Sequence, residues 1–171
     1  MNKKEKTDFY TTATKKLLAH LSDIGLQPED KRKAVYYTKL FREAFKYDDI
    51  KKHVFLSSKN AQWSFGYDSA GFCYASSVVF SIVTGFQNWN LMYIDSDKWR
   101  GHLPHYYLQH IESGNFFDIT YDQFGIDGLT VPYEIGEITP FALTAGDTPF
   151  RFADALDIDL IKILKNSNPR K

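Results

Sequence analysis

The sequence predicts an α+β fold in which a cysteine-bearing helix packs on a small antiparallel sheet, between an N-terminal helical hairpin and a C-terminal helix. Three observations support this. Apolar residues recur with helical spacing in two stretches within residues 1–50. Residues 69–85 combine a loop of small residues with a buried helix. Residues 88–120 change to short strand-like segments, and such segregation of helices from strands is typical of α+β proteins.

Composition and length indicate one globular domain spanning residues 1–171. Apolar residues make up 43% and charged residues 25%, as in ordinary folded proteins. Within this domain we distinguish a helical N-terminal extension, 1–50, from a core, 60–165. Lys plus Arg and Asp plus Glu both number 21. The resulting net charge of zero argues against a nucleic-acid partner bound through bulk charge.

The compartment is predicted from the cysteine and the apolar runs. One cysteine excludes an internal disulfide and fits a reducing compartment. The N-terminal stretch has no apolar segment of signal-peptide length, and no run approaches the ~18 apolar residues that would span a bilayer. We therefore expect a cytoplasmic protein with no membrane partner, while the oligomeric state stays open.

The N-terminal extension is expected to form two amphipathic helices. Residues 1–6 are charged and expected to fray, and residues 8–26 follow a helical pattern. The second helix, 28–47, starts with a proline, which suits a first helical turn, and has an aromatic inner face made by Tyr37, Phe41 and Phe45. These helices either pack on the core or form a cap that selects a substrate or partner.

The middle of the chain leads to the cysteine. Residues 53–56 fit a short strand or the tail of a helix, and a polar loop follows. Cys73 lies at or near the first turn of the next helix, whose apolar positions follow i, i+1, i+4, i+5 spacing. The β-branched residues of this run leave a buried strand as the alternative.

Three strands and a helix are expected to complete the fold. Residues 88–94, 105–111 and 115–120 have strand-like patterns, and the last two flank a hairpin turn with glycine at position 114. A loop with short extended pieces, 121–147, leads to a helix over 148–164.

Cys73, His105 and Asp118 form the candidate catalytic set. A helix N-terminus favours thiolate over thiol, because it is the positive end of the helix dipole. Nucleophilic catalysis by sulfur also needs an imidazole within hydrogen-bond reach and a group that fixes the imidazole tautomer. His105 at the start of one strand and Asp118 inside the next have the required chemistry.

The stretch from His105 to Thr120 resembles the His-strand, turn and Asp-x-Thr pattern of papain-like and transglutaminase-like cysteine enzymes. More narrowly, residues 63–164 resemble the YunG-like family of small bacterial proteins. The segments that carry this resemblance are Gly71-Phe72-Cys73-Tyr74-Ala75, His105-Tyr106-Tyr107, Asp118-Ile119-Thr120-Tyr121-Asp122-Gln123-Phe124 and Arg151-Phe152-Ala153-Asp154-Ala155-Leu156. The resemblance implies a papain-like core with Cys73 as nucleophile, His105 as base and Asp118 as orienter.

The chain departs from the family in one respect: Phe72 stands directly before Cys73, where the family usually has glutamine. Gln62 is the candidate replacement in an oxyanion-stabilising role, together with the backbone N–H of Cys73. Trp63 is a candidate residue of the cleft lining.

The register of the predicted hairpin bears on the choice of orienter. A two-residue turn at Ser113-Gly114 would place Asp118 diagonally away from His105 and Asp122 opposite it. A longer loop would bring Asp118 closer. Asp118 is preferred on the resemblance, and Asp122 is the reserve orienter.

Together these features predict a cysteine-dependent acyl-transfer enzyme, a peptidase, amidase, deamidase or transglutaminase-like transferase. Its substrate would be a peptide, a protein or a small amide, and it would need no cofactor. A zinc site made by Cys73, His102 and His105 is disfavoured, because one cysteine and a loose H-x-x-H spacing are poor ligand patterns. The alternative function is a non-catalytic binding module that retains the fold.

Overall fold

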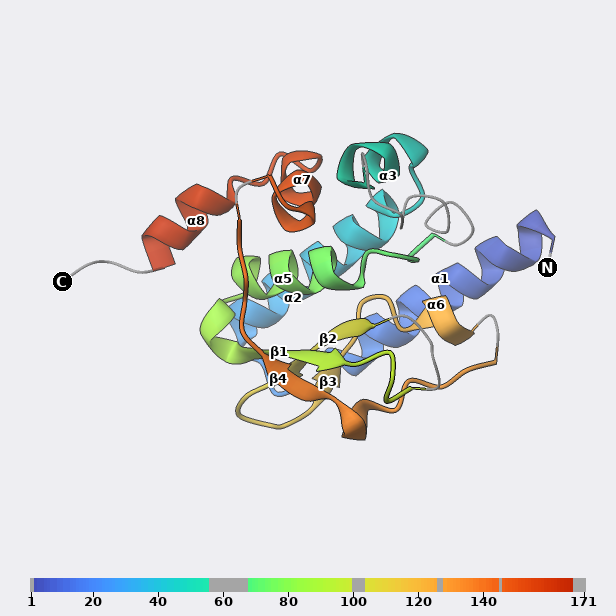
Figure 1. Ribbon diagram of the computed structural model, residues 1–171, viewed down its shortest axis with the longest axis horizontal. Helices are drawn as coiled ribbons and strands as arrows, with labels where there is room; N and C mark the ends of the chain where they lie inside the picture. Colours follow the sequence, from blue (N-terminus) through green and yellow to red (C-terminus); the bar gives the residue numbers. More distant parts are fainter. Residues whose placement is uncertain (1, 56–67, 100–103, 126–127, 145, 168–171) are drawn as a thin grey trace.

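The computed structural model describes residues 2–55, 68–99, 104–125, 128–144 and 146–167 of the 171-residue chain. It confirms the predicted α+β class (Figure 1). The helices are α1 (Lys3–His20), α2 (Pro28–Ala44), α3 (Asp48–Phe55), α5 (Cys73–Val83), α6 (Asp122–Gly125), α7 (Thr148–Asp154) and α8 (Leu160–Ser167). The strands are β1 (Trp89–Ile94), β2 (His105–His110), β3 (Phe116–Phe117) and β4 (Glu137–Thr139), with 3-10 turns η1 (Phe86–Asn88) and η2 (Tyr133–Ile135).

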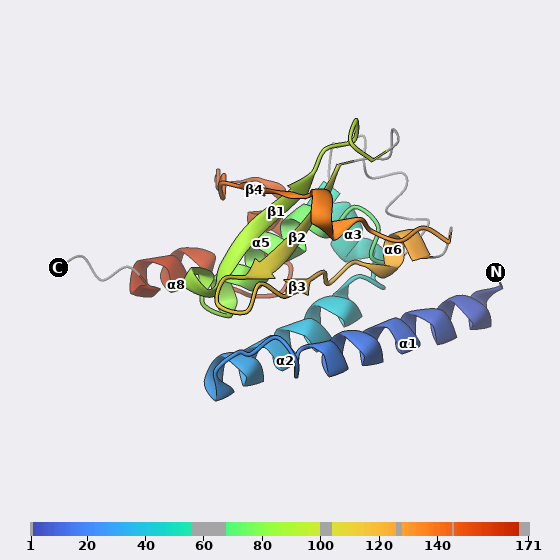
Figure 2. The ribbon, with the colours of Figure 1, turned by 90° about the horizontal axis from the view of Figure 1, so that it is seen from below.

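The four strands form one antiparallel sheet in the order β3-β2-β1-β4. Helix α5 packs against β1 and β2, and α2, α7 and α8 also pack against α5 (Figure 1). The cysteine-bearing helix is therefore enclosed between the sheet and the other helices, which explains why its sequence is apolar almost throughout. Figure 2 shows α1 and α2 beyond the β3 edge of the sheet.

The N-terminal helices belong to the main core. Their apolar faces and those of α5, the sheet and α7 form one continuous cluster, which includes Leu17, Leu21, Phe41, Phe45, Val79, Phe80, Trp89, Leu108, Phe117 and Phe152. Phe41 and Phe45 contact Phe152 with ring centroids 4.9 and 5.8 Å apart. The predicted aromatic inner face of α2 is thus a core surface.

Helix α1 begins earlier than the sequence analysis predicts. The expectation of a frayed start is wrong for residues 2–6, because Asn2 and Glu5 form a capping box that starts the helix at Lys3. The side chain of Asn2 accepts from the N–H of Glu5 at 3.0 Å, and Glu5 accepts from the N–H of Asn2 at 2.7 Å.

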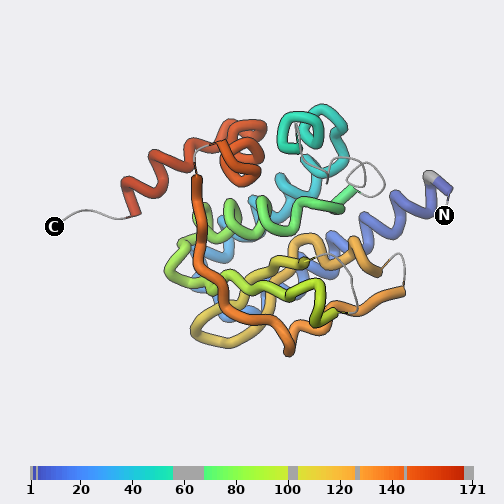
Figure 3. The backbone as a smooth tube through the Cα atoms, viewed as in Figure 1, coloured from blue at the N-terminus to red at the C-terminus, as the bar shows by residue number. Residues whose placement is uncertain are grey.

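Of three further expectations, one was left open, one needs correction and one is confirmed. Residues 48–55 form helix α3, so the helical alternative for 53–56 is the right one as far as the described residues reach. The C-terminal helix is divided into α7 and α8, with Asp157 at φ 55° between them. Within residues 121–147, one short extended piece is strand β4, which pairs with β1 (Figure 3).

The hairpin between β2 and β3 has a longer loop than the two-residue turn. Leu108 pairs with Phe117 and Gln109 with Phe116. The His110 N–H donates to the Asn115 carbonyl at 2.9 Å, so four residues, 111–114, form the loop. Strand β3 ends at Phe117, so the prediction that Asp118 lies inside this strand is wrong. Asp118 is the first residue after the strand.

Within the described part of the chain, no helix combines the length and the apolar character that crossing a lipid bilayer requires.

Candidate active site

Cys73 is the first residue of α5, as the sequence predicts. The turn before it is closed by a hydrogen bond from the Phe72 N–H to the Ser69 carbonyl, 3.3 Å, and Gly71 adopts a φ of 81° that favours glycine. The first N–H groups of a helix have no acceptor within it, so the start of α5 presents donors beside a partly exposed sulfur.

The packing of the Phe72 side chain explains why an apolar residue occupies the position before Cys73. Its side chain is fully buried and stacks on Phe45 at 4.5 Å between ring centroids, with Phe55 at 4.9 Å and Phe152 at 5.3 Å. Phe45 directly follows α2, and Phe55 and Phe152 lie in α3 and α7, so Phe72 fixes the start of α5 against three other helices. It points into the core and offers no hydrogen bond to an oxyanion.

His105 is the first residue of β2, where it pairs with Ile94 of β1. Its imidazole is fully buried and lies edge-on to Phe124 at 4.9 Å between centroids, with Trp99 at 6.4 Å. The Nε2 atom lies 2.6 Å from Oδ2 of Asp118. The structure therefore brings His105 and Asp118 into direct contact.

Asp118 is held by four hydrogen bonds. Oδ2 accepts from His105 Nε2 and, at 3.0 Å, from the hydroxyl of Tyr133. Oδ1 accepts from the N–H and the hydroxyl of Thr120, both at 3.0 Å. These four donors fix the orientation of the carboxylate beside His105.

The surroundings of His105 favour its protonated form. Burial lowers the pKa of the imidazole, but the charge of Asp118, the hydrogen bond to it, and a side-chain hydrogen bond and charge interaction with Cys73 outweigh burial and raise that pKa to about 10. Cys73 therefore interacts electrostatically with His105. Because Asp118 occupies Nε2, Cys73 would have to reach Nδ1, which also lies 3.2 Å from Gln123 Nε2.

Asp122, the reserve orienter, does not contact His105. Its carboxylate pairs with Arg42 of α2, with distances of 2.5 Å from Nη1 to Oδ1 and 3.0 Å from Nη2 to Oδ2. Ser69, at the turn before Cys73, donates to the same carboxylate at 3.2 Å. Asp122 therefore ties the site loop to α2 and to the turn that precedes the cysteine.

The remaining predicted residues lie outside the described ranges. These are Gln62 and Trp63, the oxyanion and cleft candidates, and His102 of the disfavoured zinc set. Among the residues that the structure describes, no group of three or more His, Cys, Asp or Glu side chains could hold a metal ion.

Four residues of the site are not predicted from the sequence: Thr120, Gln123, Tyr133 and Arg42. Thr120 and Gln123 belong to the Asp118–Phe124 motif, so the sequence places them close to Asp118. The motif alone does not indicate which hydrogen bonds their side chains make. Tyr133 and Arg42 gave no such signal, because each reaches the site from a distant part of the chain through tertiary packing.

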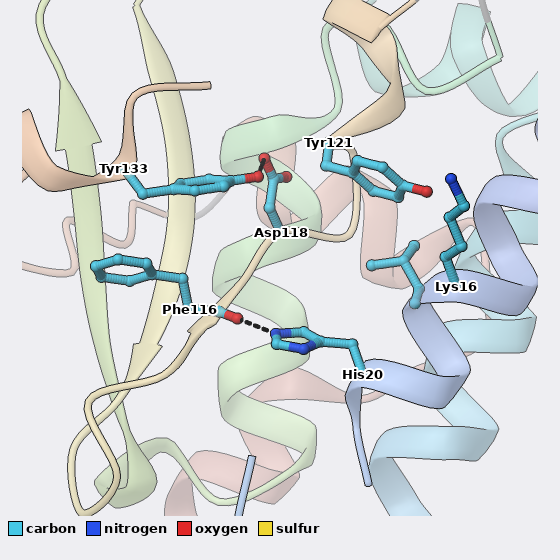
Figure 4. Close-up of a pocket in the computed structure, with 7 residues that line it drawn as sticks. Lys16, His20, Phe116, Asp118, Tyr121 and Tyr133 are labelled. Atoms are coloured by element: carbon cyan, nitrogen blue, oxygen red, sulfur yellow. Dashed lines mark hydrogen bonds between the residues drawn. The ribbon is translucent and has the colours of Figure 1, made fainter. Parts of the chain in front are cut away.

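A cavity of about 220 Å³ lies on another side of Asp118, between α1 and the β3 edge (Figure 4). Its lining includes Leu17, Phe116, Tyr121 and Tyr133, with Lys16 and His20 from α1. His20 closes one side, since its Nε2 lies 2.6 Å from the Phe116 carbonyl oxygen. Neither Cys73 nor His105 is among its described lining residues, so this cavity is separate from the sulfur.

Comparison with known proteins adds no relative: no family model, no curated protein and no solved structure matches this chain. The site is therefore interpreted from its own geometry.

Proposed function

We propose that this protein is a cysteine-dependent acyl-transfer enzyme in which Cys73 is the nucleophile, His105 the acid and base, and Asp118 the orienting carboxylate. One observation carries the proposal: a buried imidazole lies 2.6 Å from a carboxylate and also interacts electrostatically with the side chain of Cys73, the first residue of a helix. Transfer of the Cys73 proton to His105 would give the thiolate that attacks a substrate.

The reaction follows from these groups. The Cys73 thiolate attacks the carbonyl carbon of an amide, a C–S bond forms, and the carbonyl electron pair moves to oxygen. The imidazolium of His105 gives its Nδ1 proton to the amine as the C–N bond breaks, which leaves a thioester on Cys73. The neutral imidazole then takes a proton from water or from an acceptor amine, which attacks the thioester and releases the thiolate.

Two features would stabilise the oxyanion and the imidazolium. The N–H groups of the first turn of α5 are directed away from the helix body, where they can donate to an oxyanion beside Cys73. Asp118 balances the charge on His105. Gln62 remains the candidate for a second, side-chain oxyanion donor.

The acyl acceptor determines the class of reaction. Water as acceptor gives a peptidase, amidase or deamidase, and an amine as acceptor gives a transglutaminase-like transferase.

A second candidate, a non-catalytic binding module, is favoured by one observation. The cavity beside Asp118 is lined by aromatic side chains and excludes Cys73 and His105 from its described lining. A protein that binds a ligand there would use the buried His105–Asp118 pair as a structural element.

The two functions are separated by a Cys73→Ala variant incubated with cell lysate beside the wild type. For an enzyme, the variant retains intact substrate that the wild type releases cleaved, deamidated or cross-linked, because binding contacts survive removal of the nucleophile. His110→Gln, which changes the other buried histidine of β2, should behave as the wild type. If mass spectrometry finds the same unmodified partner on both proteins, the enzyme proposal is wrong and the protein is a binding module.

A further inference from the structure

Four buried side chains beside Cys73 form a closed ring of hydrogen bonds. Asp118 Oδ2 contacts His105 Nε2 at 2.6 Å, and His105 Nδ1 contacts Gln123 Nε2 at 3.2 Å. Gln123 Nε2 donates to Thr120 Oγ1 at 3.1 Å, and the Thr120 hydroxyl donates to Asp118 Oδ1 at 3.0 Å, which closes the ring. All four residues are buried.

The direction of each hydrogen bond in this ring is determined by counting donors. Thr120 has one hydroxyl proton, which it gives to Asp118, so toward Gln123 it can only accept. The Gln123 atom facing Thr120 must therefore be the amide nitrogen, and the second hydrogen of that nitrogen is available to His105 Nδ1. Nδ1 accepts this hydrogen only when it carries no proton of its own.

We propose that Gln123 is a positioning residue that keeps the neutral form of His105 protonated on Nε2 and leaves Nδ1 as the basic nitrogen for Cys73. Thr120 positions Gln123 in turn, because it fixes which end of the Gln123 amide faces the imidazole. The role toward Cys73 rests on the proposed function, whereas the tautomer rests on the hydrogen bonds alone.

This arrangement has a consequence for proton transfer. When Nδ1 takes a proton from Cys73, the Gln123 N–H faces a donor, so its hydrogen bond is lost or the amide must turn. Gln123 therefore opposes protonation of His105, while Asp118 favours it. The balance between these two neighbours sets the pH at which Cys73 becomes a thiolate.

Few other ionisable groups face His105 among the described residues. Tyr133 contacts the imidazole only through Asp118, and Tyr107 of β2 stacks at 6.1 Å between centroids. On the β1 side its partner is Ile94. The Arg42–Asp122 ion pair also bonds to the Ser69 hydroxyl and to the Ile119 carbonyl.

The test uses Gln123→Met, which keeps side-chain length and removes the donor, and Thr120→Val, which keeps shape and removes the hydroxyl. Gln109→Met, at a β2 glutamine bonded to the Gly114 carbonyl, is the matched control. Because the chain has one cysteine, iodoacetamide modification reports Cys73 alone. The midpoint of the alkylation rate against pH should move toward acid by about 0.5–1 pH unit in Gln123→Met, the value of one hydrogen bond.

Thr120→Val should shift the midpoint in the same direction, and Gln109→Met should leave it unchanged. Nitrogen-15 NMR of the wild type gives a readout that needs no variant. Above the pH of about 10 at which His105 loses its second proton, Nε2 should carry the remaining proton. A proton on Nδ1 overturns the proposal, as does a folded Gln123→Met variant with an unchanged midpoint. Alkylation that does not depend on His105 refutes the proposed function instead, and the NMR result on the His105 tautomer still stands by itself.

Discussion

Replacing Arg42 with methionine should destabilise the protein by about 3–5 kcal/mol, the cost of leaving one partner of a buried ion pair uncompensated. The side chains of Arg42 and Asp122 are only 1% and 3% exposed. The guanidinium makes two bonds to the carboxylate and also donates to the Ile119 carbonyl at 3.2 Å and to Thr14 Oγ1 at 3.1 Å. Methionine replaces none of these donors, so Asp122 would keep only Ser69 among these partners.

Urea unfolding followed by circular dichroism measures this loss. Lys33→Met is the matched control, because Lys33 pairs with Glu29 at 3.0 Å on the exposed surface and should cost less than about 1 kcal/mol. Removing both charges, as Arg42→Met with Asp122→Leu, should cost less than Arg42→Met alone, since no buried charge then lacks a partner. An Arg42→Met loss no larger than that of the control would refute the reasoning.

Three further predictions concern the site. Asp118→Asn should lower the pKa of His105 and abolish alkylation of Cys73 at acid pH. Asp122→Asn should reduce stability and leave the dependence of alkylation on pH intact. The reverse result would make Asp122 the orienter. The pKa of His105 is about 10 in the folded protein and about 6.5 when unfolded, so its stabilising contribution relative to His105→Gln should be complete below pH 6.5 and decline toward pH 10 in urea titrations. Tyr133→Phe should cost about 1 kcal/mol by the same assay, the net value of its bond to Asp118, and a neutral change would count against that bond.

Much of the architecture could be predicted from local patterns. The period of apolar residues and the proline at position 28 predict α2 to within a few residues. The small residues before Cys73 correctly predict that it lies at a helix start. The strand pattern found β1 and β2 with His105 at the first position of its strand. These signals lie within one segment each, so they are visible without tertiary information.

The features that could not be predicted from the sequence depend on contacts between segments that are distant along the chain. The loop over 111–114 is also stabilised by bonds from Ser113 to the Ile24 carbonyl and from Asn115 to the Asp23 carbonyl, which a local turn rule cannot include. The same holds for Arg42, since only packing of α2 against the site loop shows why an arginine is buried in a helix. The start of α1, in contrast, could have been predicted locally, because Asn2 and Glu5 have the spacing of a capping box.

The most direct test of sulfur activation by His105 is the alkylation rate of Cys73 against pH, in the wild type and in His105→Ala. An unperturbed thiol has a pKa of about 8.5. We predict substantial modification of the native wild-type protein at pH 6 and a large drop in His105→Ala, with His110→Gln unchanged. A rate that rises only above about pH 8 and is the same in His105→Ala would contradict the role of Cys73 as an activated nucleophile.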